Sequence, residues 1–418
     1  MRKMKQSGVP WLGEIPEGWR IARIKNKFSI SGGSTPASDN PLYWDGEISW
    51  ITPADMTDFG TIYKGRRFLT VEGFNACGTQ MASKGDIVIS TRAPIGKVNI
   101  CEKELCTNQG CKTLRNEKED NRYSAYYLFS IQEVLNSLGK GTTFFELSAQ
   151  ELSIFPLIFP SLPEQTTIVD FLDNQCEKID TIIALEETII TELCEYKKSI
   201  IQKAIDDNSI NWETQRFTIF FSLGKGLPIT KADLQDEGIP VVSYGEIHSK
   251  YGRELNPDIH PLKYVKDTYL KSNKDCLLQY GDFVFADTSE DLEGSGNFTF
   301  LNSHTPVFAG YHTIIARPEI EVDFLFLSFL CDSYKFREQI QSQVVGIKVF
   351  SITKGLLKNV NLWLPPLPEQ KAIAAYLDKK TGEVDKLISI KQKKIIQLKE
   401  YKKSLIYEYV TGKKEVPA

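Results

Sequence analysis

The sequence Leu-Pro-Glu-Gln occupies residues 162–165 and returns at residues 367–370, and Glu-Tyr-Lys-Lys-Ser occupies residues 195–199 and returns at residues 400–404. Both recurrences have the same spacing of 205 residues, about half of the 418-residue chain. At that spacing 45 positions, beginning at Pro160, align without a gap, and 18 of them are identical. A repeat of this length predicts an internal duplication, with one structural unit in each half of the chain.

Each copy of the repeat predicts one long helix. Proline fits the first turn of a helix, where its missing N–H group costs no hydrogen bond, and the adjacent glutamate is favoured by the positive end of the helix dipole. In the first copy no further proline or glycine follows within the repeat, and Gly382 is the first to follow in the second copy. We therefore expect two helices of about 40 residues, each roughly 60 Å long at 1.5 Å per residue.

Apolar residues recur along each helix at the seven-residue spacing of a coiled coil. Glu186 and Lys197 are polar interruptions in the first copy. We expect the two apolar seams to pack together, and the alternative is that each helix lies on its own globular domain. The seam positions are Leu172, Cys176, Ile179, Ile183, Ile190, Leu193, Ile200 and Ala204, and in the second copy Leu377, Thr381, Val384, Ile388, Lys391, Ile395, Leu398, Lys402, Leu405 and Tyr409.

The charges of the two helical segments also favour pairing. Residues 159–205 contain 9 acidic and 4 basic side chains, and residues 364–418 contain 7 acidic and 12 basic side chains, so the segments carry net charges of −5 and +5. Glu186 and Lys391 occupy equivalent seam positions with opposite charges. We predict an antiparallel pair, in which equivalent residues meet only at the local two-fold axis, and that these two residues lie close together. A parallel pair would also bring them together, but it would then place Glu195 beside Glu400.

The two remaining segments predict globular domains of mixed α/β structure. An alternating apolar run follows a glycine turn at residues 85–90 and again at residues 281–286, which is typical of a buried strand. Helices are expected over residues 123–138 and 324–341. The predicted fold is therefore two α+β domains, each followed by one long helix, related by the internal duplication.

Composition limits the class of protein. With 41% apolar, 25% charged and 11% aromatic residues, the chain should fold into at least two globular domains. We expect a cytoplasmic location, because no apolar run approaches the roughly 20 residues of a membrane span and none follows the basic N-terminus. The eight cysteines should be reduced. Three of them, Cys101, Cys106 and Cys111, are spaced too widely for a typical zinc site and are interpreted as buried thiols.

The chain lacks recognisable catalytic, cofactor-binding and metal-binding motifs. Residues 40–43 read Asn-Pro-Leu-Tyr, which departs from the Asn-Pro-Pro-aromatic motif of amino-methyltransferases and is interpreted as a turn. Residues 139–142 lack the spacing of a phosphate-binding loop. The four histidines form no pair at helical spacing. We therefore predict no catalytic residue, no cofactor and no metal site in this chain.

The paired Leu-Pro-Glu-Gln and Glu-Tyr-Lys-Lys-Ser segments, the strand at residues 85–90 and the opening segment 9–19 resemble the specificity subunit of type I restriction-modification systems. The resemblance covers the whole chain. It implies a non-catalytic subunit in which residues 1–158 and 208–363 are target recognition domains and residues 159–207 and 364–418 are conserved spacer helices. It also implies that each domain reads one half of a bipartite site in double-stranded DNA, with the gap fixed by the helices. Two methyltransferase subunits would dock on the helices, and restriction subunits are a further candidate partner.

Sequence reading in the major groove requires polar or planar side chains on exposed loops. The first globular segment carries a net charge of +2 and the second, counted over residues 206–363, a net charge of −6, so the isolated chain should bind DNA weakly. A non-enzymatic protein adaptor is the alternative function. The candidate DNA-binding residues are Ser90, Thr91, Arg92, Lys97, Asn108, Gln109, Lys140, Thr142 and Thr143 in the first segment and Tyr244, Glu246, His248, Thr288, Ser289, Tyr311, His312 and Lys348 in the second.

Overall fold

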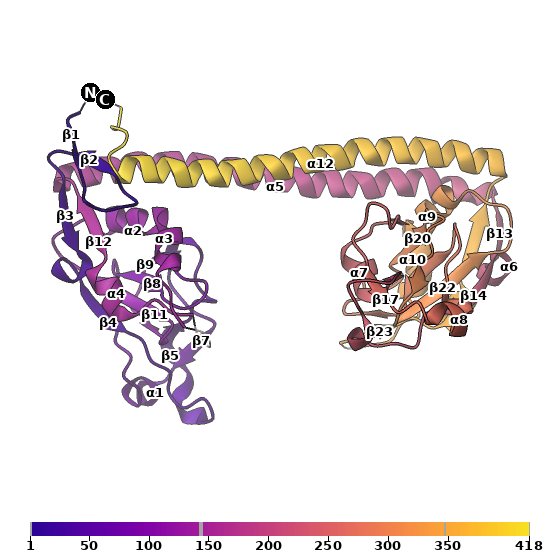
Figure 1. The fold of residues 1–418 in the computed structure, drawn as a ribbon, viewed down its shortest axis with the longest axis horizontal. Helices are drawn as coiled ribbons and strands as arrows, with labels where there is room; N and C mark the ends of the chain where they lie inside the picture. The colour runs from indigo at the N-terminus through magenta and orange to yellow at the C-terminus, as the bar shows by residue number, and fades with distance from the viewer. Residues whose placement is uncertain (1, 142–144, 347, 418) are drawn as a thin grey trace. The chain divides into compact units, whose positions relative to one another are not determined.

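The chain forms two compact units, and Figure 1 labels many of their helices and strands. The computed structural model describes residues 2–141, 145–346 and 348–417. Unit 1 contains the residues up to Glu187 and those from Lys393 onward, and unit 2 contains Thr188–Gln392. Each unit therefore combines one globular segment with a part of each long helix.

The two long helices are α5 (Leu162–Ile205) and α12 (Leu367–Val410), each of 44 residues. Each begins one residue before the proline of its Leu-Pro-Glu-Gln segment, as the sequence predicts. The proline thus occupies the first turn, where its missing N–H group leaves no gap in the hydrogen-bond ladder.

Within each unit α5 and α12 are antiparallel. In unit 1, Nζ of Lys402 lies 2.7 Å from the carboxylate of Asp180, and Nζ of Lys394 lies 2.6 Å from Oε1 of Glu186. From Asp180 to Glu186 along α5, the partner on α12 moves back from Lys402 to Lys394, so the two helices run in opposite directions. In unit 2, Nζ of Lys197 lies 2.7 Å from the carboxylate of Asp385. This pair is the 205-residue equivalent of the pair between Lys402 and Asp180, so the duplication makes the same ion pair once in each unit. A partnership of Glu186 with Lys391, which belongs to the other unit, stays a prediction.

The predicted apolar seam is confirmed by its burial. Because each unit contains parts of both helices, the alternative in which each helix lies alone on its own domain does not describe either unit. Seam positions buried in the structure are Leu172, Cys176, Ile179, Ile183, Ile200, Leu377, Thr381, Val384, Ile395, Leu405 and Tyr409, and half-buried ones are Ile190, Leu193, Ala204, Ile388 and Leu398.

The globular part of unit 1 is built on a five-stranded sheet of order β4-β11-β8-β9-β6 and a three-stranded sheet of order β10-β5-β7. The first comprises β4 (Ser29–Gly32), β11 (Cys111–Arg115), β8 (Ile87–Ser90), β9 (Val98–Cys101) and β6 (Phe59–Ile62), and the second β10 (Cys106–Thr107), β5 (Trp44–Ile51) and β7 (Arg67–Leu69). Two-stranded sheets join β12 (Pro156–Phe159) to β3 (Arg20–Arg23) and β1 (Met4–Gln6) to β2 (Glu14–Pro16).

Unit 2 repeats this topology, which supports the duplication of the globular segments. Its five-stranded sheet has the order β14-β22-β18-β20-β16 and its three-stranded sheet the order β17-β15-β21. The strands are β14 (Phe221–Lys225), β22 (Thr313–Pro318), β18 (Phe283–Ala286), β20 (Phe298–Leu301) and β16 (Glu254–Leu255), then β17 (Lys263–Val265), β15 (Ile239–Val242) and β21 (Phe308–Ala309). Two-stranded sheets join β13 (Glu213–Arg216) to β24 (Asn361–Leu364) and β19 (Thr288–Ser289) to β23 (Phe350–Ser351).

Each of the two helices predicted in the globular segments is broken into a pair. Residues 123–138 lie in α2 (Asn121–Ser130) and α3 (Gln132–Ser137), and residues 324–341 lie in α9 (Phe324–Asp332) and α10 (Tyr334–Gln341). Ser333 interrupts the second pair because it is extended, and its hydroxyl caps the N-terminus of α10. The remaining helices are α1 (Val71–Asn75), α4 (Ala149–Ile154), α6 (Phe217–Phe220), α7 (Tyr244–Ser249), α8 (Tyr269–Ser272) and α11 (Lys354–Asn359).

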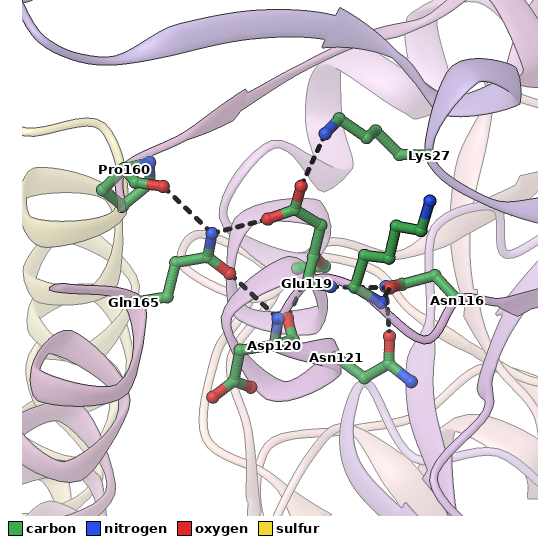
Figure 2. A network of polar contacts seen from close by, with 9 residues as sticks. Lys27, Asn116, Glu119, Asp120, Asn121, Pro160 and Gln165 are labelled. Atoms are coloured by element: carbon green, nitrogen blue, oxygen red, sulfur yellow. Dashed lines mark hydrogen bonds and ion pairs between the residues drawn. The ribbon is translucent and has the colours of Figure 1, made fainter. Parts of the chain in front are cut away.

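The glutamine of each Leu-Pro-Glu-Gln segment fastens the long helix to the globular part of its unit. Gln165 is fully buried; its Nε2 donates to the carbonyl of Pro160 at 3.1 Å and to Glu119 at 2.8 Å, and its Oε1 accepts from the backbone N–H of Asp120 at 2.9 Å (Figure 2). Gln370 makes the same two backbone bonds in unit 2, to the carbonyl of Pro365 at 2.9 Å and from the N–H of Asp323 at 3.0 Å. Asp120 and Asp323 cap α2 and α9, so one side chain aligns two helices.

The cysteines predicted to be buried thiols lie in the strands of unit 1. Cys101, Cys106 and Cys111 are at most 1% exposed, in β9, β10 and β11. Burial in an apolar environment raises the pKa of each thiol to about 12. They are therefore protonated core side chains rather than ligands of a metal ion.

Candidate nucleic-acid interface

The candidate residues cluster at corresponding ends of the two five-stranded sheets. In unit 1 the end of β8 faces the start of β11, with Ser90 opposite Cys111. In unit 2 the end of β18 faces the start of β22, with Ala286 opposite Thr313. The segments that leave these strand ends carry most of the predicted residues, so the duplicated fold presents one such edge in each unit. We call these two regions the sheet edges.

Several candidate side chains at the sheet edge of unit 1 form hydrogen bonds with the protein's own backbone. Ser90 is fully buried; its hydroxyl donates to the carbonyl of Pro94 at 2.6 Å and accepts from the N–H of Lys97 at 2.9 Å. Thr91 is also buried and donates to the carbonyl of Gly110 at 3.3 Å. Nζ of Lys97 donates to two backbone carbonyls of the segment that follows β5, at 2.8 and 3.2 Å. Ser90 and Thr91 are therefore not presented on the surface of the edge, and the half-buried Lys97 is held by the backbone.

Other candidates in unit 1 are accessible. Gln109 is exposed, and its Oε1 accepts a hydrogen bond of 2.5 Å from the hydroxyl of Thr35. Asn108 is half-buried and accepts from the N–H of Gly110 at 2.9 Å. Arg92 forms an ion pair of 2.9 Å with Glu146 while about a third of its side chain stays exposed (34%). The edge of unit 1 therefore offers amide and guanidinium groups held by neighbours.

The remaining candidates in this segment are Lys140, whose backbone pairs with that of Glu146, the ion-pair partner of Arg92, and two residues outside the described structure. Lys140 is largely exposed and pairs with Glu151 at 2.6 Å. Thr142 and Thr143 lie outside the described residues.

In unit 2 the structure brings together four predicted residues from two segments. The ring of Tyr244, at the start of α7, lies 5.7 Å from that of Tyr311, 5.4 Å from that of His312 and 6.3 Å from that of His248. All three contacts are edge to face, which is a favoured arrangement of aromatic rings. We call these residues the aromatic cluster. Burial raises the pKa of the Tyr311 hydroxyl, with smaller contributions from Glu246 and Tyr244, so this group is a hydrogen-bond donor at neutral pH.

The other candidates in unit 2 have mainly structural contacts. Glu246 accepts from the N–H of Ser243 at 3.2 Å and so caps α7. Ser289 is buried and donates to the carbonyl of Asp291 at 2.7 Å. Thr288 donates to Asp287 at 2.7 Å. Lys348 is exposed.

Sequence reasoning missed two kinds of residue at these edges. Asp287 accepts from Nδ1 of His312 at 3.1 Å, but its position directly after a buried strand was the only signal. Thr35 follows Gly32 and Gly33, and the close approach of Gly33 to the backbone of residues 107 and 108 is the reason why a glycine is needed there. A glycine pair before a polar residue could have identified this loop.

Within residues 2–141, 145–346 and 348–417 there is no group of three or more potential metal ligands. Over the same residues no helix is long and apolar enough to cross a membrane.

Comparison with known proteins identifies a family. The family model described as the type I restriction modification DNA specificity domain matches residues 16–195 and again residues 210–400. The type I restriction enzyme MjaIX specificity subunit of Methanocaldococcus jannaschii is 34% identical over 190 residues, which are 44% of this chain and 44% of that protein. The match thus spans less than half the length of this relative. A second match, to the putative MjaX specificity subunit, spans 43% of that protein.

Two comparisons cover nearly the whole chain. The MjaVIII specificity subunit of the same organism is 22% identical over 96% of this chain and 93% of its own. A chain from a solved structure that describes complex assembly and conformational transition of the type I R-M system superposes with a TM-score of 0.72 at 16% identity, over 95% of this chain and 99% of that one. The structural likeness supports the same fold.

Proposed function

The chain belongs to the type I restriction modification DNA specificity family, and we propose that it is the non-catalytic DNA-recognition subunit of a type I restriction-modification complex. The observation that carries this proposal is the duplicated sheet edge: one fold occurs twice with different side chains at the same place. A protein that reads two different half-sites needs this combination, because the scaffold is reused while the contacts to bases change.

We assign residues 1–158 and 208–363 as the two target recognition domains and residues 159–207 and 364–418 as the spacer helices. Each domain reads one half of a bipartite site in double-stranded DNA, and the helices fix the number of base pairs between the halves. The accessible candidates make the contacts to bases, among them the half-buried Arg92 and Tyr311 and the exposed Gln109 and His312. The buried candidates Ser90, Thr91 and Ser289 hold the backbone of the loops that carry these residues.

The partners we propose are two methyltransferase subunits that dock on the long helices, with restriction subunits as further partners. In support, exposed apolar side chains recur at equivalent positions: Ile182 and Leu185 in unit 1 correspond to Leu387 and Ile390 in unit 2, and each is 39–60% exposed. An outward apolar surface that is repeated by the duplication suits two copies of one partner. The globular segments, with net charges of only +2 and −6, also call for partners that supply phosphate contacts.

The test is a comparison of methylated sequences in the host genome with and without this gene. We expect one two-part methylated motif that disappears with the gene and returns when the gene is restored. An unchanged set of methylated motifs, in cells that express the whole system, would refute the proposal.

A further inference from the structure

One residue of the sheet edge in unit 2 has an unusual backbone. His312 has a φ of 54°, in the left-handed region that residues other than glycine rarely adopt. Asp287 holds it there twice: the N–H of Asp287 donates to the carbonyl of His312 at 3.1 Å, and its carboxylate lies 3.1 Å from Nδ1 of the ring. A strained residue that its surroundings fix in place is a reason to look for a function.

Unit 1 has the same backbone contact without the side chain. There the N–H of Thr91 donates to the carbonyl of Gly110 at 2.8 Å, and these two residues stand one position outside the Ser90–Cys111 pair. Asp287 and His312 stand one position outside the corresponding pair in unit 2. The second unit therefore carries an imidazole where the first carries a glycine.

The contacts of the ring fix its hydrogen-bonding pattern. An ionised carboxylate can only accept, so Nδ1 must carry the hydrogen that Asp287 receives. In the neutral ring Nε2 is then an acceptor, and it points away from the carboxylate because the two nitrogens lie on different sides of the imidazole. The side chain is 57% exposed, and edge contacts to Tyr244 and Tyr311 limit its rotation.

We propose that His312 is a specificity-determining residue of the second domain, and that its Nε2 accepts a hydrogen bond from the exocyclic amino group of an adenine or a cytosine in the major groove. In that groove the amino groups of these two bases are donors, whereas guanine and thymine present acceptors there. Asp287 is a positioning residue, because it sets the tautomer and the direction of the ring. This inference rests on the proposed function of the chain.

The experiment measures binding of the assembled methyltransferase complex to duplexes in which single bases of the second half-site lack their amino group. Purine replaces adenine and 2-pyrimidinone replaces cytosine, one position at a time, with the base that the complex methylates left intact. For the unsubstituted protein we expect about a tenfold loss of affinity at one position that depends on His312.

Two variants of the histidine keep the test independent of folding. His312→Ala removes the ring, and His312→Asn keeps a residue that tolerates positive φ while shortening the side chain. Both should bind the modified and unmodified duplexes equally at that one position and leave the first half-site unchanged. Asp287→Ala should reduce the sensitivity at the same position and at no other. His304→Ala, at an exposed histidine that stacks on Tyr280, is the matched control and should behave as the unsubstituted protein does.

The outcomes distinguish a failure of the role proposed for His312 from a failure of the proposed function of the chain. If both His312 variants keep the full sensitivity at every position, the inference is overturned while the proposed function stands. If the unsubstituted complex binds no bipartite site, the proposed function itself fails.

Discussion

Replacing Gln165 by leucine should loosen the attachment of α5 to the first globular segment without affecting the second. The leucine fills a similar volume but leaves the N–H of Asp120 and the carbonyl of Pro160 without the bonds of 2.9 and 3.1 Å that the amide provides. A buried backbone group that loses its partner costs about 1–3 kcal/mol. We take about 3 kcal/mol for the two groups together, which corresponds to roughly a 100-fold change in a local opening equilibrium.

Hydrogen exchange of backbone amides, followed by mass spectrometry, measures this local opening directly. In Gln165→Leu, peptides that contain Asp120 should exchange about 100-fold faster, and peptides that contain Asp323 should be unchanged. Gln370→Leu should give the reverse pattern, so each unit is the control for the other. If either variant changes the exchange of its own peptide by less than about threefold, the attachment that we ascribe to this glutamine is wrong.

Three further predictions concern the core, the thiols and the docking surface. Asp282→Ala should destabilise the second unit by about 3–5 kcal/mol in urea unfolding, because it leaves the guanidinium that pairs with Asp282 at 2.7 Å without its carboxylate, and Asp86→Ala should cost less because the arginine there is more exposed. A thiol reagent at pH 8 should modify the exposed Cys194 quickly and spare the thiols whose pKa burial raises to about 12; rapid labelling of those buried thiols in the folded protein would contradict the burial described here. Leu185→Asp together with Ile390→Asp should abolish co-purification of methyltransferase subunits while leaving the circular dichroism spectrum unchanged, and undiminished co-purification would exclude this surface.

The helices were predictable because their signals are local and strong. Pro163 marks the start of α5, and the seven-residue spacing from Leu172 onward identifies the buried face. The antiparallel direction was predicted for the duplicated helices, and two ion pairs together, Lys402 with Asp180 and Lys394 with Glu186, confirm it in unit 1. The broken helices were not predictable from periodicity, because Ser333 ends α9 by capping the next helix rather than by disrupting the apolar pattern.

The candidate residues were predictable as segments but not as side chains. Loops that follow a buried strand reach the sheet edge, so Thr91 and Gln109 were both selected, but only the structure shows that the first is buried and the second exposed. A hydroxyl can bond to its own backbone as readily as to a ligand, and sequence does not separate these cases. The aromatic cluster likewise depends on Tyr244 and Tyr311, which are 67 positions apart and meet through the pairing of β15 with β21.

The duplication keeps its contacts where both units need the same geometry and changes them where recognition must differ. Both units retain the buried glutamines and the lysine–aspartate pairs of the helices. The glutamines bond to the backbone of the globular segments, and the ion pairs join α5 to α12. At the sheet edges backbone bonds persist while side chains change: the bond between Thr91 and Gly110 in unit 1 corresponds to the bond between Asp287 and His312 in unit 2. That bond uses no side chain, so it is present in both units although the residues at both of its positions differ. The two edges can therefore acquire different base preferences independently, whereas a change at Gln165 or Gln370 disturbs the attachment of a whole helix.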